Sequence, residues 1–322
     1  MTRDAAARRH RAVFVPVLAA LALASCGLTS PEAPARRPQP RALAPVVPEG
    51  PPEPSRESRA VARHFADVQS DLLGRGLLRR DGGGPDTPWG PRQLSENFVR
   101  IALYDEYVSH GGRLLAQETP SRLRRWQAPV RIGLRFGDSV REEQQDRDRA
   151  AVADYARRLS RATGHPVRLS DQNPNFWLYV VSEDERPGMG PEWETLFPGL
   201  DPQALTAATA MPLSTFCIVL AISDGSSPVY TGALAVVRAE LPDLMRLSCF
   251  HEELAQGMGL ANDHPGARPS IFNDDEEFAT LTTMDETLLS VLYDRRLQPG
   301  MREAEVLPLL PGMIAERLPG GS

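Results

Sequence analysis

The spacing of apolar and polar residues changes several times along the chain, and each change predicts a new element. Residues 59–80 carry apolar side chains at helical spacing and run into a Gly/Pro-rich stretch, so we expect an isolated helix there. Ser95 precedes apolar residues at helical spacing, which predicts that it is the N-cap of a second helix. Residues 129–136 alternate between apolar and polar side chains, as a half-buried strand does. Residues 143–163 have one apolar face and precede Gly164, which predicts a long helix with a left-handed cap.

Beyond Gly164 the pattern predicts more strands and then more helices. The expected strands span residues 167–170, 176–181, 215–222 and 231–239, and the expected helices span residues 241–258 and 284–293. Helices and strands are therefore largely segregated along the chain. This order predicts an α+β fold, in which one mixed sheet is covered by packed helices.

The first 26 residues have the order of a secretory signal peptide, with a basic start followed by an apolar run from Val13 to Ala24. That run is about half the length that a membrane-spanning helix needs, which disfavours a permanent transmembrane segment. Leu23-Ala24-Ser25-Cys26 resembles the lipobox of bacterial lipoproteins. The resemblance implies cleavage before Cys26, acylation of Cys26 by fatty acids such as palmitate, and anchoring to the lipid bilayer. Gly27 then favours the outer membrane, facing the periplasm, within the cell envelope.

Proline-rich sequence follows the expected lipid anchor. Nine prolines lie between Gly27 and Ser58 with almost no bulky apolar residue, so this stretch should form a disordered tether rather than a core. We therefore expect a signal peptide at 1–25, a lipidated Cys and linker at 26–58, a helix and Gly/Pro linker at 59–93, a folded domain at 94–301 and a C-terminal helix or tail at 302–322.

Charge and cysteine content narrow the class of protein. The chain has no Lys and a net charge of −6, which gives no support to nucleic-acid binding. Of its three Cys residues, Cys26 is expected to carry lipid, which leaves Cys217 and Cys249 in an oxidising compartment. A disulfide between them is favoured. Two buried free thiols remain the alternative, because a sequence does not reveal the Cα separation that a bridge requires.

The densest cluster of chemically reactive side chains lies between residues 249 and 264. On a helix, one polar face would gather Cys249, Glu252, Glu253 and Gln256 opposite an apolar stripe. Gly259 can end that helix in a left-handed turn, which would fold Asn262 and Asp263 back toward the polar face. His251-Glu252 is not the start of an H-E-x-x-H zinc motif, because position 255 is Ala, and we expect His251 at the surface or rim.

A frame shifted by one residue resembles the zinc helix of metzincins. Glu252-Glu253-x-x-Gln256-x-x-Gly259-x-x-Asn262 matches H-E-x-x-H-x-x-G-x-x-H with all three His replaced, and Phe272 stands at the position of the Met-turn methionine. The element order from Trp126 onward also fits a zincin-like mixed sheet. The sequences at 252–263, 269–274 and 292–301 together resemble a family of bacterial lipoproteins known only as a domain of unknown function, and this resemblance covers Leu94 to Met301.

The metzincin resemblance implies roles for individual residues. Glu252, Gln256 and either Asn262 or Asp263 would stand at ligand positions, and Glu253 at the general-base position. Neutral amide oxygens are weak ligands for zinc, and carboxylates with amides suit calcium better, although no calcium-binding loop is evident. We therefore expect no cofactor, with zinc and calcium left open.

Two functions and one structural role are consistent with this cluster. The first function is a binding or scaffolding module that has lost catalytic zinc, with an envelope protein or peptide as its partner. The alternative is an atypical hydrolase of peptide or peptidoglycan that uses Glu253 as general base. In the structural role, the polar residues only pin the Asn262-Asp263 corner beneath the helix.

Overall fold

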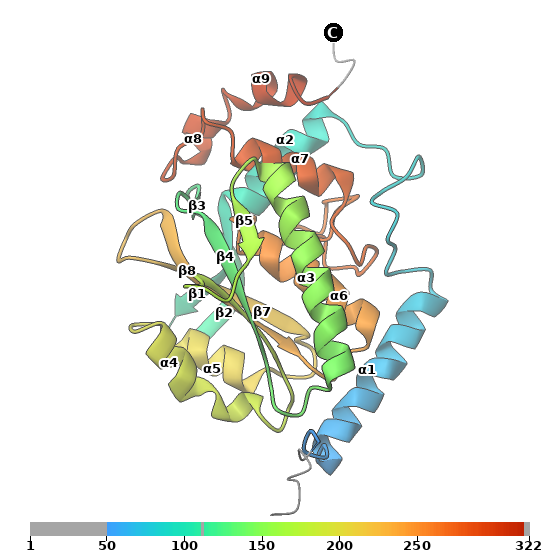
Figure 1. Ribbon diagram of the computed structural model, residues 1–322. Coiled ribbons are helices and arrows are strands. Elements are labelled where there is room, and N and C mark those ends of the chain that lie inside the picture. Colours follow the sequence, from blue (N-terminus) through green and yellow to red (C-terminus); the bar gives the residue numbers. More distant parts are fainter. Residues whose placement is uncertain (1–49, 111–112, 319–322) are drawn as a thin grey trace, which may run out of the picture. The chain divides into compact units, whose positions relative to one another are not determined.

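A six-stranded sheet covered by helices on both faces forms the centre of the protein (Figure 1). The computed structural model describes residues 50–110 and 113–318, so the expected signal peptide, Cys26 and most of the expected tether lie outside the described residues. The described helices are α1 (Arg56–Gly74), α2 (Pro91–Ala102), α3 (Glu142–Thr163), α4 (Gly190–Leu196), α5 (Pro202–Ala210), α6 (Asp243–Gln256), α7 (Thr283–Leu292), α8 (Glu303–Val306) and α9 (Leu310–Ala315). The described strands are β1 (Tyr104–His110), β2 (Arg113–Pro120), β3 (Arg125–Trp126), β4 (Val130–Phe136), β5 (Val167–Leu169), β6 (Phe176–Val181), β7 (Cys217–Ser223) and β8 (Val229–Arg238).

The main sheet is parallel except at one edge. Its strands follow the order β5-β4-β6-β8-β7, and the short β3 pairs with the start of β8. β7 alone runs antiparallel, with Cys217 opposite Val237. β1 and β2 form a separate antiparallel hairpin. The expected α+β fold with one mixed sheet is therefore confirmed, and the sheet is mostly parallel.

Alternate residues of the central strands face two different cores. On β6, Phe176, Leu178 and Val180 pack into the larger core, while Tyr179 and Val181 pack into the smaller one under α4 and α5. β6 reads as a continuous apolar run because both of its faces are buried. No helix among the described residues combines the length and apolar character that crossing a membrane requires.

A buried ion pair fixes α6 against α3. Arg246 and Asp148 are 2% and 5% exposed, and Arg246 Nε lies 2.7 Å from Asp148 Oδ2. Arg246 also donates to the carbonyl of Leu241, just before α6. Removing one partner would leave an uncompensated charge in a dry interior, so the pair favours this packing of the helix that carries the candidate site.

α1 forms where the sequence predicts a helix, but it is not isolated. Its side chains Val61, Phe65 and Leu72 are buried in the larger core. Phe65 packs edge-on against Phe216, with ring centroids 5.6 Å apart. Ser58 Oγ donates to Glu240 Oε1 at 2.8 Å. The prediction of an isolated helix was wrong because its apolar face has a partner more than 150 residues away in sequence.

Most predicted elements match the structure within two residues, and the long helix α3 ends at Gly164 with φ +65° as expected. The expected cap at Ser95 is wrong. α2 begins earlier, with Gly90 as N-cap and Pro91 as its first residue. Proline suits that position because its fixed φ is already helical and its missing N–H would have had no partner there.

Candidate functional site

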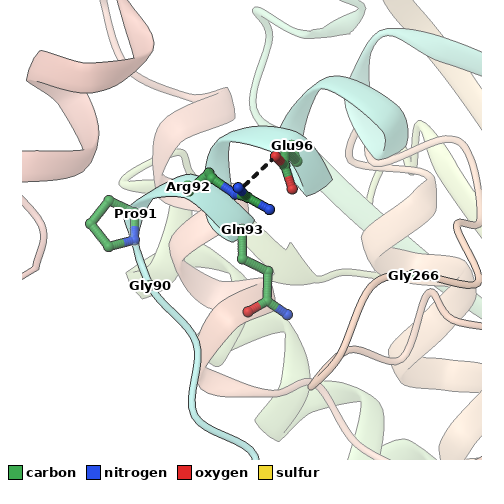
Figure 2. A pocket seen from close by; sticks show the side chains of 6 residues that line it. All are labelled: Gly90, Pro91, Arg92, Gln93, Glu96 and Gly266. Carbon is green, nitrogen blue, oxygen red and sulfur yellow. Dashed lines mark ion pairs between the residues drawn. The ribbon is translucent and has the colours of Figure 1, made fainter.

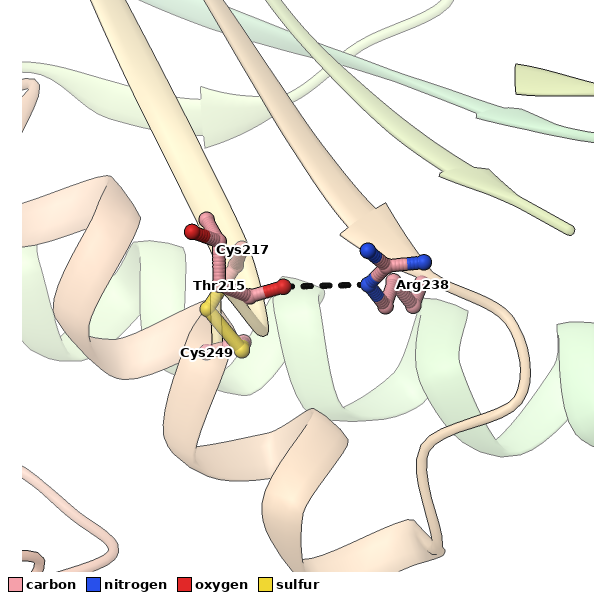
Figure 3. Close-up of a disulfide and its surroundings, with 4 residues drawn as sticks. All are labelled: Thr215, Cys217, Arg238 and Cys249. Atoms are coloured by element: carbon pink, nitrogen blue, oxygen red, sulfur yellow. Dashed lines mark hydrogen bonds between the residues drawn. A yellow bond between two sulfur atoms is a disulfide. The ribbon is translucent and has the colours of Figure 1, made fainter. Parts of the chain in front are cut away.

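The candidate site lies on α6, the helix that follows the last strand of the sheet. Cys249 in the middle of α6 forms a disulfide with Cys217 at the start of β7, and their Cα atoms are 5.9 Å apart. This bond confirms the expected pairing. Figure 3 shows it beside Thr215, whose carbonyl accepts a hydrogen bond from Arg238 Nε at 3.0 Å. The disulfide thus ties the polar face of α6 to the antiparallel edge of the sheet.

His251 points away from this polar face. The side chain is 7% exposed and stacks on Tyr155, with ring centroids 3.8 Å apart. Its Nδ1 accepts a hydrogen bond from the N–H of Leu281 at 3.0 Å, so Nδ1 carries no proton. Burial lowers the pKa of His251 to about 3, which keeps the ring neutral. The expectation of a surface or rim histidine was wrong, because the imidazole packs against Tyr155 of α3 and accepts a hydrogen bond from Leu281 in the loop before α7.

Glu252 and Glu253 stand next to the disulfide. A carboxylate oxygen of each and the Sγ of Cys217 all lie within 4.8 Å of one another. Glu253 is 4% exposed, whereas Glu252 is only partly buried. Desolvation, followed by the nearby charges of Asp263, Glu253, Glu276 and Asp274, raises the pKa of Glu252 well above its usual value. The polar face of α6 is therefore a crowded set of carboxyl groups in which negative charge is disfavoured.

The turn after α6 returns Asp263, but not Asn262, to the polar face of that helix. Gly259 has φ +122°, and a Cβ there would collide with the carbonyl of Arg124, so the turn needs glycine. Gln256 Nε2 donates to Asp263 Oδ1 at 3.2 Å, which joins Asp263 to the polar face as predicted. Asn262 is 1% exposed and instead donates from Nδ2 to the carbonyl of Arg100 at 2.9 Å. Asn262 anchors the loop to the end of α2.

Asp285 organises the loop between the turn and α7, a role that the sequence pattern did not predict. It is 0% exposed and accepts from Ser270 Oγ at 2.5 Å, from Ile271 N–H at 3.1 Å, and from Thr282 N–H and Oγ1 at 2.8 and 2.9 Å. Burial raises its pKa, and these hydrogen bonds oppose the rise. The neighbouring Phe272 is fully buried. The sequence does contain a signal for part of this role, because Thr282-x-x-Asp285 has the spacing of a capping box at a helix N-terminus.

The residues at the positions that the metzincin resemblance assigns to ligands do not fit zinc. The Gln256 and Asn262 amides are occupied by Asp263 and by the carbonyl of Arg100. Among the described residues, the group of His, Cys, Asp and Glu side chains close enough to share an ion is Cys217, Glu252 and Glu253. It contains no imidazole, and the disulfide removes the thiolate. A catalytic zinc site needs several such donors.

A surface hollow lies at the start of α2 rather than on α6. Its volume is about 480 Å³. Figure 2 shows the residues that line it, among them Arg92, which pairs with Glu96; the N–O distance of this pair is 3.2 Å. A hollow of about 310 Å³ on the sheet is lined in part by Arg135 and Trp177. Arg135 already stacks on the Trp177 ring, 5.0 Å from its centroid. Neither hollow contains the convergent side chains that the α6 face provides.

The fold and this site define an α+β protein, braced by a disulfide, whose candidate site is a carboxylate and amide face rather than a histidine-based metal centre. The model of a family described as "Protein of unknown function (DUF2927)" matches residues 91–312, and the chain belongs to this family. The search of curated proteins gave no match. The search of solved structures gave none either. The helix α1 precedes the matched region.

Proposed function

We propose that this protein is a lipoprotein of the cell envelope, anchored through Cys26, whose domain binds an extended peptide segment along β7 beside the acidic face of α6. The observation that carries the proposal is the antiparallel edge strand β7, linked by a disulfide to that face. The anchor rests on the lipobox-like sequence at Leu23–Cys26. A disulfide is also typical of exported proteins rather than cytosolic ones.

β7 offers backbone groups to a partner strand. Among the described strands it pairs only with β8, and each of its residues is at least partly exposed. An edge strand with unpaired N–H and C=O groups can accept an added strand from a peptide, and main-chain hydrogen bonds then supply affinity. Side-chain specificity would come from the groups that stand beside the strand.

Those neighbouring groups are acidic. Glu252 and Glu253 lie next to Cys217, the first residue of β7. Asp263, Asp274 and Glu276 are close enough to Glu252 to raise its pKa. A basic side chain placed among these groups would relieve their mutual repulsion, because an opposite charge favours the ionised carboxylate. The preferred peptide therefore carries Lys or Arg.

The zincin resemblance supports a binding role over catalysis. The sequence that resembles a metzincin zinc helix lies on α6 and the turn after it, and α6 follows β8, the neighbour of the antiparallel edge strand β7. In this chain the corresponding helix has carboxyl and amide groups where imidazoles would be needed, and His251 is held in the core by Leu281. A domain that keeps the edge strand without the metal donors can still bind a partner strand.

We expect a fluorescent peptide of alternating Val and Lys to bind the oxidised protein more tightly than a matched Val and Glu peptide. Glu252→Gln should weaken that binding about 10- to 100-fold, because a hydrogen bond to a charged group contributes about 1.5–3 kcal/mol. The affinity of the wild type should rise with pH, since Glu252 loses its proton only as the pH passes its raised pKa. Fluorescence anisotropy measures both effects.

Glu194→Gln on the exposed surface of α4 is the matched control and should leave affinity and its pH dependence unchanged. Equal binding of the Lys and Glu peptides would contradict the proposal. Cleavage of the bound peptide, abolished by Glu253→Gln, would favour the atypical hydrolase instead.

A further inference from the structure

We propose that reduction of the Cys217–Cys249 disulfide creates a binding site for zinc or a similar transition-metal ion, with two thiolates and the carboxylates of Glu252 and Glu253 as ligands. The three donor atoms from Cys217, Glu252 and Glu253 lie within 4.8 Å of one another. The fourth donor, Cys249 Sγ, is bonded to Cys217 Sγ and therefore stands beside them. Two sulfur and two oxygen donors make the four ligands that zinc takes in proteins.

The placement of these four donors follows from the fold. Cys249, Glu252 and Glu253 occupy positions i, i+3 and i+4 of α6, so their side chains share one face of that helix. Cys217 comes from β7, which the sheet holds against this face. Donors from two rigid elements are brought together before any metal arrives. This set differs from the Glu252, Gln256 and Asn262 positions implied by the metzincin resemblance.

The oxidation state of the sulfurs decides whether the site exists. The thiolate is the form of cysteine that binds metals, and a disulfide has no thiolate. In the oxidised protein two carboxylates remain, with no strong donor between them. The reduced protein gains two strong, soft donors, which transition metals such as zinc prefer.

A dithiol reductant can carry out the conversion. One of its thiolates attacks Cys217 Sγ, which belongs to the more exposed partner, since Cys249 is only 2% exposed. A mixed disulfide forms at Cys217, and Cys249 leaves as a thiolate that takes a proton. The second thiol of the reductant then attacks its own mixed-disulfide sulfur and releases Cys217. Two electrons and two protons pass to the protein, and the reductant becomes a disulfide.

Metal binding and reduction are therefore linked. An ion that binds only the reduced protein displaces the two thiol protons and stabilises that state. Each tenfold shift of the equilibrium toward the reduced protein raises the reduction potential by about 30 mV for a two-electron couple. The bond that braces α6 to β7 would thus be replaced by a metal bridge between the same two elements.

The test uses the full chain, reduced with a phosphine that is then removed without oxygen. Zinc affinity is measured by competition with a chromophoric chelator, and cobalt absorption reports thiolate ligation. We expect stoichiometric zinc in the reduced protein and at least about 100-fold weaker binding in the oxidised protein, which has no thiolate. Reduced Glu252→Gln should lose at least the roughly 10- to 100-fold in affinity that disturbing a partner of a metal ligand costs. Zinc should also raise the reduction potential measured in a thiol buffer.

Reduced Glu194→Gln is the control and should bind zinc as the wild type does. The inference is overturned if the reduced and oxidised proteins bind zinc equally. It is also overturned if Glu252→Gln has no effect in the reduced protein, since thiols of an unfolded chain would bind zinc without that carboxylate. The inference does not rest on peptide binding, which is measured on the oxidised form.

Discussion

Replacing Asp285 with Ala is expected to lower the free energy of unfolding by about 3–5 kcal/mol, because several buried donors would lose their acceptor. Asp285 is 0% exposed and receives hydrogen bonds from Ser270, Ile271 and Thr282. Alanine can accept none of them, and the cavity is too enclosed for bulk water to do so. Ser270 and Ile271 in the loop would lose their hydrogen bonds to the first turn of α7. Urea denaturation followed by circular dichroism measures the loss.

Thr287→Ala on the same helix provides the control. Its hydroxyl is exposed and bonds only to the carbonyl of Thr283 within its own helix, so the change should stay within about 0.5 kcal/mol of the wild type. A loss below about 1 kcal/mol for Asp285→Ala would mean that the Asp285 network does not stabilise this loop.

Replacing both Cys217 and Cys249 with Ala should lower the free energy of unfolding by about 3–4 kcal/mol. The bond closes a segment of 32 residues, and the entropy of an unfolded chain with a loop of that length accounts for a loss of this size. Domains are commonly stable by about 5–15 kcal/mol, so the double variant should still fold. Denaturation curves of the wild type and the variant measure the difference.

Chemical reduction of the wild type gives an independent comparison for the double variant. In the absence of metal, the reduced protein and the double variant should unfold at similar denaturant concentrations. If removing the bond leaves stability unchanged, the disulfide does not brace α6 to β7, and a metal bridge there would have no structural consequence.

Local sequence patterns were sufficient to predict elements that bury the same face, or both faces, along their whole length. β6 is a run of apolar residues because both of its faces are buried, and α3 shows one apolar stripe and a terminal Gly164. The pattern did not predict α5 (Pro202–Ala210), although its first residue, Pro202, is well suited to the first turn of a helix. The hairpin of β1 and β2 has no regular alternation that would distinguish it from a loop.

The candidate site could be predicted only where its residues share one helix. Cys249, Glu252, Glu253 and Gln256 converge as the helical period requires, and the Gly259 turn returns Asp263 to them. The inward rotation of His251 could not be inferred, because it depends on Tyr155 and Leu281 from distant segments. The same holds for Asp285, whose contact with Ser270 crosses a loop.

The zinc content of the oxidised full chain, purified without added metal or chelator, tests the central claim most directly. We propose that the α6 face binds a peptide segment without catalytic zinc, because its donors are carboxyl and amide groups and His251 is turned away. Elemental analysis should therefore find far less than one zinc per chain. Stoichiometric zinc in the oxidised protein, lost in Glu252→Gln, would contradict the account and restore a metallohydrolase.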